Sequence, residues 1–227
     1  MPQRGFVLIE VAIALLVLAL ILGGILAPLN AQVEQGKIRD TNKVISDINE
    51  ALLGYVMING RLPRPATAST NGVENASACA SEAACTGFIP WTTLGSGKLD
   101  AWGNIIRYSV TPAFANAAFA LTTVGTKTIQ ERNAASALVS YATLVPVVVW
   151  SNGPENFGTN GTAAVRANNS SGVTNADEIT NNTASTTFIR RIQVNNSAAT
   201  GGEFDDIVTF IPTAILVNKA IAAGKLP

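Results

Sequence analysis

The chain has 227 residues, of which 48% are hydrophobic, and its 15 basic and 15 acidic side chains give a formal net charge of zero. This balance provides no general attraction to nucleic acid, whose binders usually carry a basic surface. Histidine is absent, which excludes Ser-His-Asp and Cys-His catalysis and every histidine-ligated metal site. Since acids are sparse and no nucleophile motif is present, we do not expect an enzyme.

The chain begins with an unbroken apolar run over residues 6–29, in which Glu10 is the one charged side chain. A helix of that length, at about 1.5 Å per residue, reaches about 36 Å, which predicts a transmembrane helix. A carboxylate inside a membrane costs about 2.5 to 3.5 kcal/mol on insertion scales, so Glu10 is expected to be functional and to have a partner. Arg4 precedes the run, which favours a cytoplasmic N-terminus with the bulk of the chain outside.

The leader ending in Gly5, then Phe6, then Glu10 as the fifth residue after the leader, resembles the class III leader of type IV pilins and type II secretion pseudopilins. The resemblance covers residues 1–30. It implies that a prepilin peptidase removes residues 1–5 and methylates the amine of Phe6. It also implies that Glu10 meets the N-terminus of a neighbouring subunit when the helices pack into a filament.

The same resemblance implies an inner-membrane assembly platform and other pilins as partners. The precursor would lie in the bacterial inner membrane, and the product would be a periplasmic or cell-surface filament. An ordinary secretory signal peptide is the alternative, although its apolar core is usually only about 7 to 15 residues long.

The next segment is predicted to be an amphipathic stem helix over residues 30–58, packed on a globular domain. Pro28, as an assembly residue of the pilin kind, predicts either a kinked or melted turn near Gly24 or a helix end at the membrane surface. The stem should end near Asn59 and Gly60, because the prolines that follow cannot continue a helix. Its apolar positions recur at helical steps: Ile38, Ile45, Ile48, Leu52 and Val56.

Residues 59–227 are expected to form a globular, pilin-like β domain with long polar loops. The predicted fold class is therefore α+β, with a long N-terminal helix, its first half membrane-spanning, packed against a small antiparallel sheet. Cys79 and Cys85 are close together in a segment placed outside the cytoplasm, which predicts a disulfide rather than two free thiols.

Several elements of this domain can be predicted. The Gly103-Asn104 turn leads into a strand over 105–110 and resembles a turn of the major pseudopilins. Pro146 should place a strand over 141–150 at an edge or bulge. Further predictions are a polar loop over 151–186, strands over 188–194 and 205–211, and a helix from Pro212 to Ala223. The stretch 112–140 has no decisive pattern.

Two candidate sites and a second function complete the expectations. Asn152, Glu155, Asp205 and Asp206 could surround Ca²⁺, as in a corresponding loop of major pseudopilins, or the aspartates could cap backbone amides instead. A basic patch for DNA could come from the stem side, although such charges usually solvate a face, so nucleic acid is not an expected partner. The alternative function is a monomeric, membrane-anchored extracytoplasmic binding domain with contact loops 66–87 and 151–203. The residues of the basic patch are Lys37, Arg39, Lys43, Arg61 and Arg64.

Overall fold

The computed structural model describes residues 8–168, 175–183 and 186–226, and within 21–29 it describes the backbone alone. Gly5 and Phe6, the residues of the predicted cleavage site, lie outside the described residues. The chain divides into two compact units, Met1–Asp40 and Thr41–Pro227, and each unit is described by itself.

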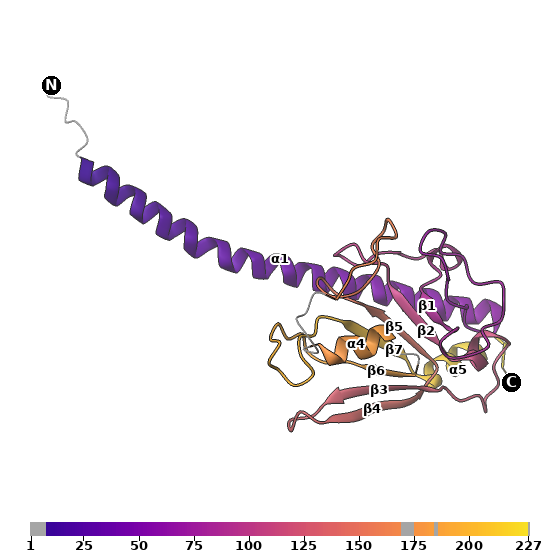
Figure 1. Cartoon of the computed structure of the whole chain (residues 1–227). Coiled ribbons are helices and arrows are strands. Elements are labelled where there is room, and N and C mark those ends of the chain that lie inside the picture. The colour runs from indigo at the N-terminus through magenta and orange to yellow at the C-terminus, as the bar shows by residue number, and fades with distance from the viewer. Residues whose placement is uncertain (1–7, 169–174, 184–185, 227) are drawn as a thin grey trace. The chain divides into compact units, whose positions relative to one another are not determined.

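The first helix, α1 (Leu8–Asn59), contributes to both units (Figure 1). Its assignment runs without a break through Gly24 and Pro28, so the structure has neither the melted turn nor the helix end considered for this region. The helix ends at Asn59, as the sequence predicted. Gly60 follows with φ +68°, and its N–H donates to the carbonyl of Val56 at 2.8 Å.

The prediction of a transmembrane helix over residues 6–29 is contradicted. Across the part of the chain that the structure describes, no helix is both long enough and apolar enough to cross a membrane.

The second unit contains a four-stranded antiparallel sheet in the order β1-β2-β5-β7. Because side chains alternate across a strand, Tyr108 and Val149 face one side, where they pack with Ile48 and Leu52 of α1 in the main hydrophobic core. The second half of α1 therefore covers one face of this sheet. The strands are β1 (Thr86–Phe88), β2 (Arg107–Val110), β5 (Val147–Ser151) and β7 (Ile207–Ile211).

A second sheet of three strands has the order β4-β3-β6, and it corrects the predicted fold class of one small antiparallel sheet. β3 pairs with β4 in antiparallel fashion and with β6 in parallel fashion. This sheet was missed because the parallel pairing joins segments far apart in the chain, which local patterns do not reveal. Its strands are β3 (Lys127–Arg132), β4 (Leu138–Val145) and β6 (Thr187–Ile189).

The two sheets share a smaller core. Val148 and Trp150 on the far face of the first sheet pack with Ile129 and Phe188 of the second, and the Trp150 and Phe188 ring centroids are 5.1 Å apart. The second unit is thus layered as helix, sheet and sheet.

Pro146 lies where the chain leaves the second sheet for the first, between β4 and β5. The strand predicted over 141–150, at an edge or bulge, is therefore two strands: its first half belongs to β4, an edge of the second sheet, and its second half to β5, which runs between β2 and β7. The proline is compatible with this place because it precedes the ladder and removes no hydrogen bond from it.

The remaining elements mostly follow the sequence. The Cys79–Cys85 disulfide is confirmed, with a Cα–Cα distance of 5.2 Å. The terminal helix begins directly after Pro212, as expected. A helix also interrupts the predicted polar loop 151–186. The short helices are α2 (Trp91–Leu94), α3 (Pro112–Ala115), α4 (Ala176–Thr183) and α5 (Thr213–Ala222).

The predicted turn before β2 is held by the carboxylate of Asp100. It accepts the N–H groups of Trp102 and Asn104 at 2.9 and 2.8 Å and the hydroxyl of Ser151 at 2.6 Å. Gly103 supplies the positive φ of +86° that the turn needs. Trp102 is only half-buried, so the turn is fixed by Asp100 rather than by a buried tryptophan.

Candidate functional site

The first turns of α1 form an exposed apolar surface. From Leu8 to Leu20 every large apolar side chain is between 45% and 88% exposed. Apolar residues occupy all sides of the helix here, with Glu10 as the one charged residue within 8–20. Soluble monomers rarely expose a continuous apolar surface of this kind, so it marks a site of interaction.

Glu10 lies in the first turn of α1, and its side chain is exposed. A carboxylate in this position is stabilised by the positive end of the helix dipole, typically by about 0.3 to 1 kcal/mol. Of the assembly residues predicted from the sequence, Glu10 is therefore at a favourable helix position. For Pro28 the structure describes the backbone alone.

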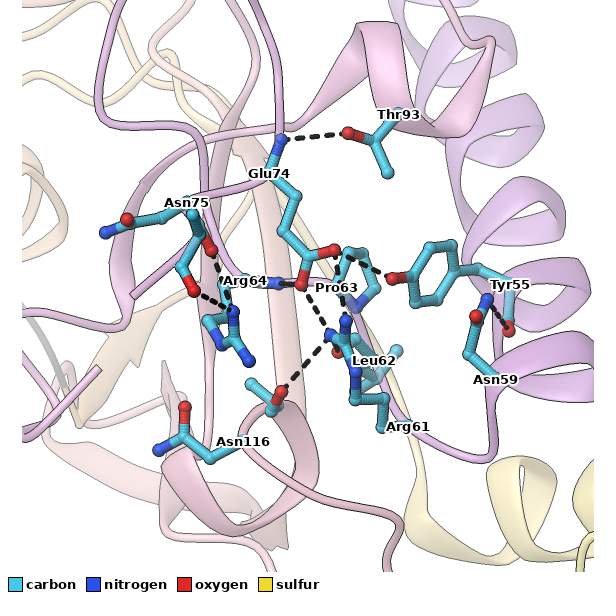
Figure 2. Close-up of polar contacts among 12 residues, drawn as sticks. Tyr55, Asn59, Arg61, Leu62, Pro63, Arg64, Glu74, Asn75, Thr93 and Asn116 are labelled. Atoms are coloured by element: carbon cyan, nitrogen blue, oxygen red, sulfur yellow. Dashed lines mark hydrogen bonds and ion pairs between the residues drawn. The ribbon is translucent and has the colours of Figure 1, made fainter. Parts of the chain in front are cut away.

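At the other end of α1, a polar cluster ties the helix to the loop that follows (Figure 2). The carboxylate of Glu74 accepts the Tyr55 hydroxyl at 2.8 Å, the Arg61 guanidinium at 2.5 Å and the backbone N–H of Arg64 at 2.9 Å. The N–H of Glu74 itself donates to Thr93 Oγ1 at 2.8 Å. Glu74 thus joins the helix and the loop through its carboxylate, and the segment around α2 through its backbone N–H.

The electrostatics of this cluster reflect burial and its hydrogen bonds. Burial, followed by the bond to Glu74, raises the pKa of Tyr55 to about 12. Burial also acts to raise the pKa of Glu74, but the bonds from Arg61, Arg64 and Tyr55 outweigh it, and the net pKa is lowered. Both residues therefore keep their protonation states at neutral pH, which indicates a structural tie rather than an acid–base site.

Most of the basic residues considered for a DNA patch form ion pairs or hydrogen bonds within the chain. Arg61 is paired with Glu74, Arg64 donates to the carbonyls of Asn75 and Ala76 at 2.9 Å, and Lys43 pairs with Asp47 at 3.2 Å. Lys37 and Arg39 belong to the first unit. The absence of a nucleic-acid partner stays a prediction, but the arrangement gives the patch no support.

A second polar cluster contains the residues considered for calcium. Asp206 is buried beside Asn181, whose amide donates to its Oδ2 at 2.8 Å. Asp205 Oδ2 accepts the backbone N–H of Glu155 at 2.8 Å, while the side chain of Glu155 is exposed. The N–H of Asp205 donates to the buried carboxylate of Glu178 at 2.8 Å.

The carboxyl groups of Asp205 and Asp206 have raised pKa values, which favour their neutral forms. Burial, then the charges of Glu178 and Asp206, raise the pKa of Asp205 to about 9. Burial also raises the pKa of Asp206 well above its ordinary value, with the bond from Asn181 opposing the shift and the charge of Glu178 adding to it. Neutral carboxyls that accept amide hydrogens suit a packed polar interior.

A calcium ion instead prefers ionised carboxylates grouped in a flexible loop. Asp205 and Asp206 come together, but Glu155 reaches the cluster through its backbone N–H. Within the described ranges, no group of three or more acidic, cysteine or histidine side chains could hold a metal ion. The arrangement therefore gives the predicted calcium site no support.

A third cluster, unforeseen from the sequence, pairs two guanidinium groups with one buried acid. The carboxylate of Asp177, at the start of α4, forms ion pairs with the guanidinium groups of Arg132 at 2.6 Å and Arg191 at 2.8 Å. A Cβ on Gly201 would lie 2.2 Å from Asp177 Oδ2, so a larger residue there would have to displace the paired side chains. The adjacent acids Asp177 and Glu178 in an otherwise uncharged, Asn-rich stretch are the sequence signal that could have indicated this cluster.

None of these clusters combines a nucleophile, a base and an open cavity. The surface that points to an activity is the exposed apolar start of α1. Comparisons with family models, with curated proteins and with solved structures found no match to this chain.

Proposed function

We propose that the chain is a structural subunit of a helical filament of the pilin or pseudopilin kind. In this proposal a prepilin peptidase cuts between Gly5 and Phe6, and the subunits assemble through the first turns of α1. The observation that carries the proposal is the exposed apolar surface of residues 8–20. The leader, which the structure does not describe, adds the resemblance given by the sequence.

The physical reason is the distribution of apolar side chains. A helix that is apolar on all sides belongs in a core, and the equivalent helices of neighbouring copies can supply one. Fully burying one Leu or Ile contributes about 1.5 to 3 kcal/mol, so covering residues 8–20 is a strong drive to assemble. Burying Glu10 in that core would be costly unless a positive group meets it, and the amine of Phe6 of the next subunit is the proposed partner.

Two variants test the role of this surface. Leu16→Asp adds a charge to the apolar stretch and should abolish filaments in electron micrographs of the native host. Val165→Asp, at a residue that is 80% exposed in the second unit, should leave them intact. Normal filaments from Leu16→Asp would contradict the proposal.

The cleavage after Gly5 and the role of Glu10 in assembly are tested by separate measurements. Mass spectrometry of the mature chain should find a methylated Phe6 at the N-terminus, and an intact Met1 would refute the cleavage. Glu10→Ala should leave cleavage unchanged but prevent incorporation into filaments. Incorporation of Glu10→Ala at the normal level would remove Glu10 from the assembly mechanism.

A further inference from the structure

Arg107, on β2, places its side chain on the far face of the first sheet, the face turned away from α1. Directly opposed residues of neighbouring antiparallel strands share a face, and Arg107 is opposite both Phe88 of β1 and Trp150 of β5. Its guanidinium packs against both rings, with Cζ 5.2 Å from the Phe88 ring centroid and 5.5 Å from that of Trp150. The three side chains therefore form a row across the sheet, with the positive charge in the middle.

This charge has no acid to balance it. Each ion pair between described residues involves another cation, and the Nε of Arg107 is buried without a hydrogen-bond partner. Burial lowers the pKa of Arg107, and no neighbouring acid opposes that shift. The buried Lys127, by contrast, is paired with Glu82. An arginine stays charged at physiological pH, so the guanidinium of Arg107 lacks a counterion that an enclosed cation normally has.

A second donor beside Arg107 also lacks a partner. Trp150 is fully buried, and its indole Nε1 has no hydrogen-bond partner in the part of the chain that the structure describes. Buried indole N–H groups usually find an acceptor, because an unmet donor away from water is costly. The guanidinium of Arg107 packs against this same ring, so the two unmet donors are neighbours. Both require an acceptor, and the cation also requires a negative charge.

Arg190 shows what stacking on a ring alone looks like. Its guanidinium lies 4.4 Å from the ring centroid of Tyr141, and that ring is 50% exposed. Within the described ranges, the buried nitrogens without a partner include Nε of Arg107 but none of Arg190. Contact with an aromatic ring and with water is therefore sufficient for Arg190, whereas the environment of Arg107 is incomplete.

We propose that Arg107 and Trp150 bind the carboxylate of a small monocarboxylate, whose oxygens accept hydrogen bonds from the guanidinium and from the indole N–H. One carboxylate can bridge these donors, because charge-assisted hydrogen bonds of about 2.7 to 2.9 Å extend from both of its oxygens. Its single negative charge balances the single guanidinium, whereas a sulfate or phosphate dianion would bring excess charge against the aromatic rings. Arg107 is only half-buried, so the ligand enters from its side. This site goes beyond the proposed function and does not depend on it.

Titration of the full chain with sodium acetate, in detergent to cover residues 8–20 and near neutral pH, tests the site. The readout is the indole N–H resonance of Trp150 in a nitrogen-15-labelled chain, identified by its loss in Trp150→Phe. Acetate at millimolar concentrations should move this resonance along a saturable curve, because the indole gains an acceptor and so small a ligand binds weakly. The resonances of Trp91 and Trp102 should stay in place. Sodium chloride and sodium sulfate at equal ionic strength should produce no saturable shift.

Two variants separate this site from arginine stacking in general. Arg107→Gln should weaken acetate binding at least about tenfold, since it removes the charge-assisted hydrogen bonds. Arg190→Gln, the matched control from the stack on Tyr141, should bind acetate as the original chain does. Melting temperatures report whether both variants fold, and the titration of the original chain decides the matter if Arg107→Gln does not. A Trp150 resonance that acetate leaves unmoved, an equal shift with sulfate, or undiminished binding by folded Arg107→Gln would overturn the proposal, even if filaments form normally.

Discussion

The two units of the chain treat their apolar side chains in opposite ways along one helix. In residues 8–20 these side chains are exposed, whereas Ile48 and Leu52 further along α1 are fully buried in the core of the second unit. The difference follows from the sequence period. In the first stretch apolar residues lie on every side of the helix, so no single face can be buried apart from the others. In the second stretch apolar residues recur every three or four positions, which places them on one face that a sheet can cover. The first region leaves its apolar side chains exposed, whereas the second buries them in its own core.

The largest effect should come from truncating the buried half of the helix. Leu52→Ala should lower the free energy of unfolding of the second unit by about 2 to 5 kcal/mol, because it opens a cavity in the core. Leu16→Ala, the same substitution in the exposed stretch, should change it by less than about 0.5 kcal/mol. Thermal unfolding measured by circular dichroism on both variants checks this, and equal effects would erase the contrast between the two regions.

A somewhat smaller effect is expected where the second unit depends on a close polar contact. Gly201→Ala should destabilise by about 1.5 to 3 kcal/mol, since its Cβ would push Asp177 away from Arg132 and break a charge-assisted hydrogen bond, although Arg191 still pairs with Asp177. Gly95→Ala is the matched control, because Gly95 also has a positive φ but has no atom within 4 Å of an added Cβ. Chemical denaturation of the two variants separates the effect of the close contact from that of backbone strain. Equal losses of stability in both variants would mean that backbone strain accounts for the whole effect.

The acidic cluster of the second unit should make its stability depend on pH. The raised pKa of Asp205, about 9, means that the folded state holds a proton that the unfolded chain has released above its ordinary pKa of about 4. Stability should therefore be highest at low pH and fall as pH rises between these two values, by about 2 to 3 kcal/mol from pH 6 to pH 8. Denaturation curves with EDTA present measure the slope, and Asp205→Asn should flatten it. A stability that rises over this range would contradict the assignment.

The smallest effect on stability should come from the hydrogen-bonded cluster around Glu74 at the end of α1. Tyr55→Phe removes the hydroxyl that donates to Glu74 and should cost about 0.5 to 1.5 kcal/mol. Tyr141→Phe, which alters an exposed ring, should cost less. If the two substitutions have the same effect on the melting temperature, the Tyr55 bond contributes no stability.

Local patterns predicted the elements whose causes are local. The end of α1 follows from Gly60 and the prolines after it, the disulfide from two nearby cysteines, and the last helix from Pro212. The second sheet could not be predicted this way, because the partners of β3 are decided by packing between distant segments. The central position of β5 was missed for a related reason: Pro146 was assigned to the strand rather than to the bend before it.

The candidate sites show the same difference between features with local causes and features that depend on distant segments. Asp205 and Asp206 were found because they are adjacent in sequence, but Glu178, which faces them, comes from a helix that the Asn-rich composition concealed. Glu74 is an isolated acid in a loop, and its role depends on Tyr55 and Arg61, which only the folded chain brings together.

The bend at Pro146 has a consequence for the order in which the second unit forms and opens. It separates a hairpin, β3 with β4, whose contacts are close in sequence, from β5, which must find β2 and β7 far along the chain. Local contacts form sooner than distant ones. The hairpin can therefore fold early and fray independently, so the amide hydrogens of β4 should exchange with solvent well before those of β5.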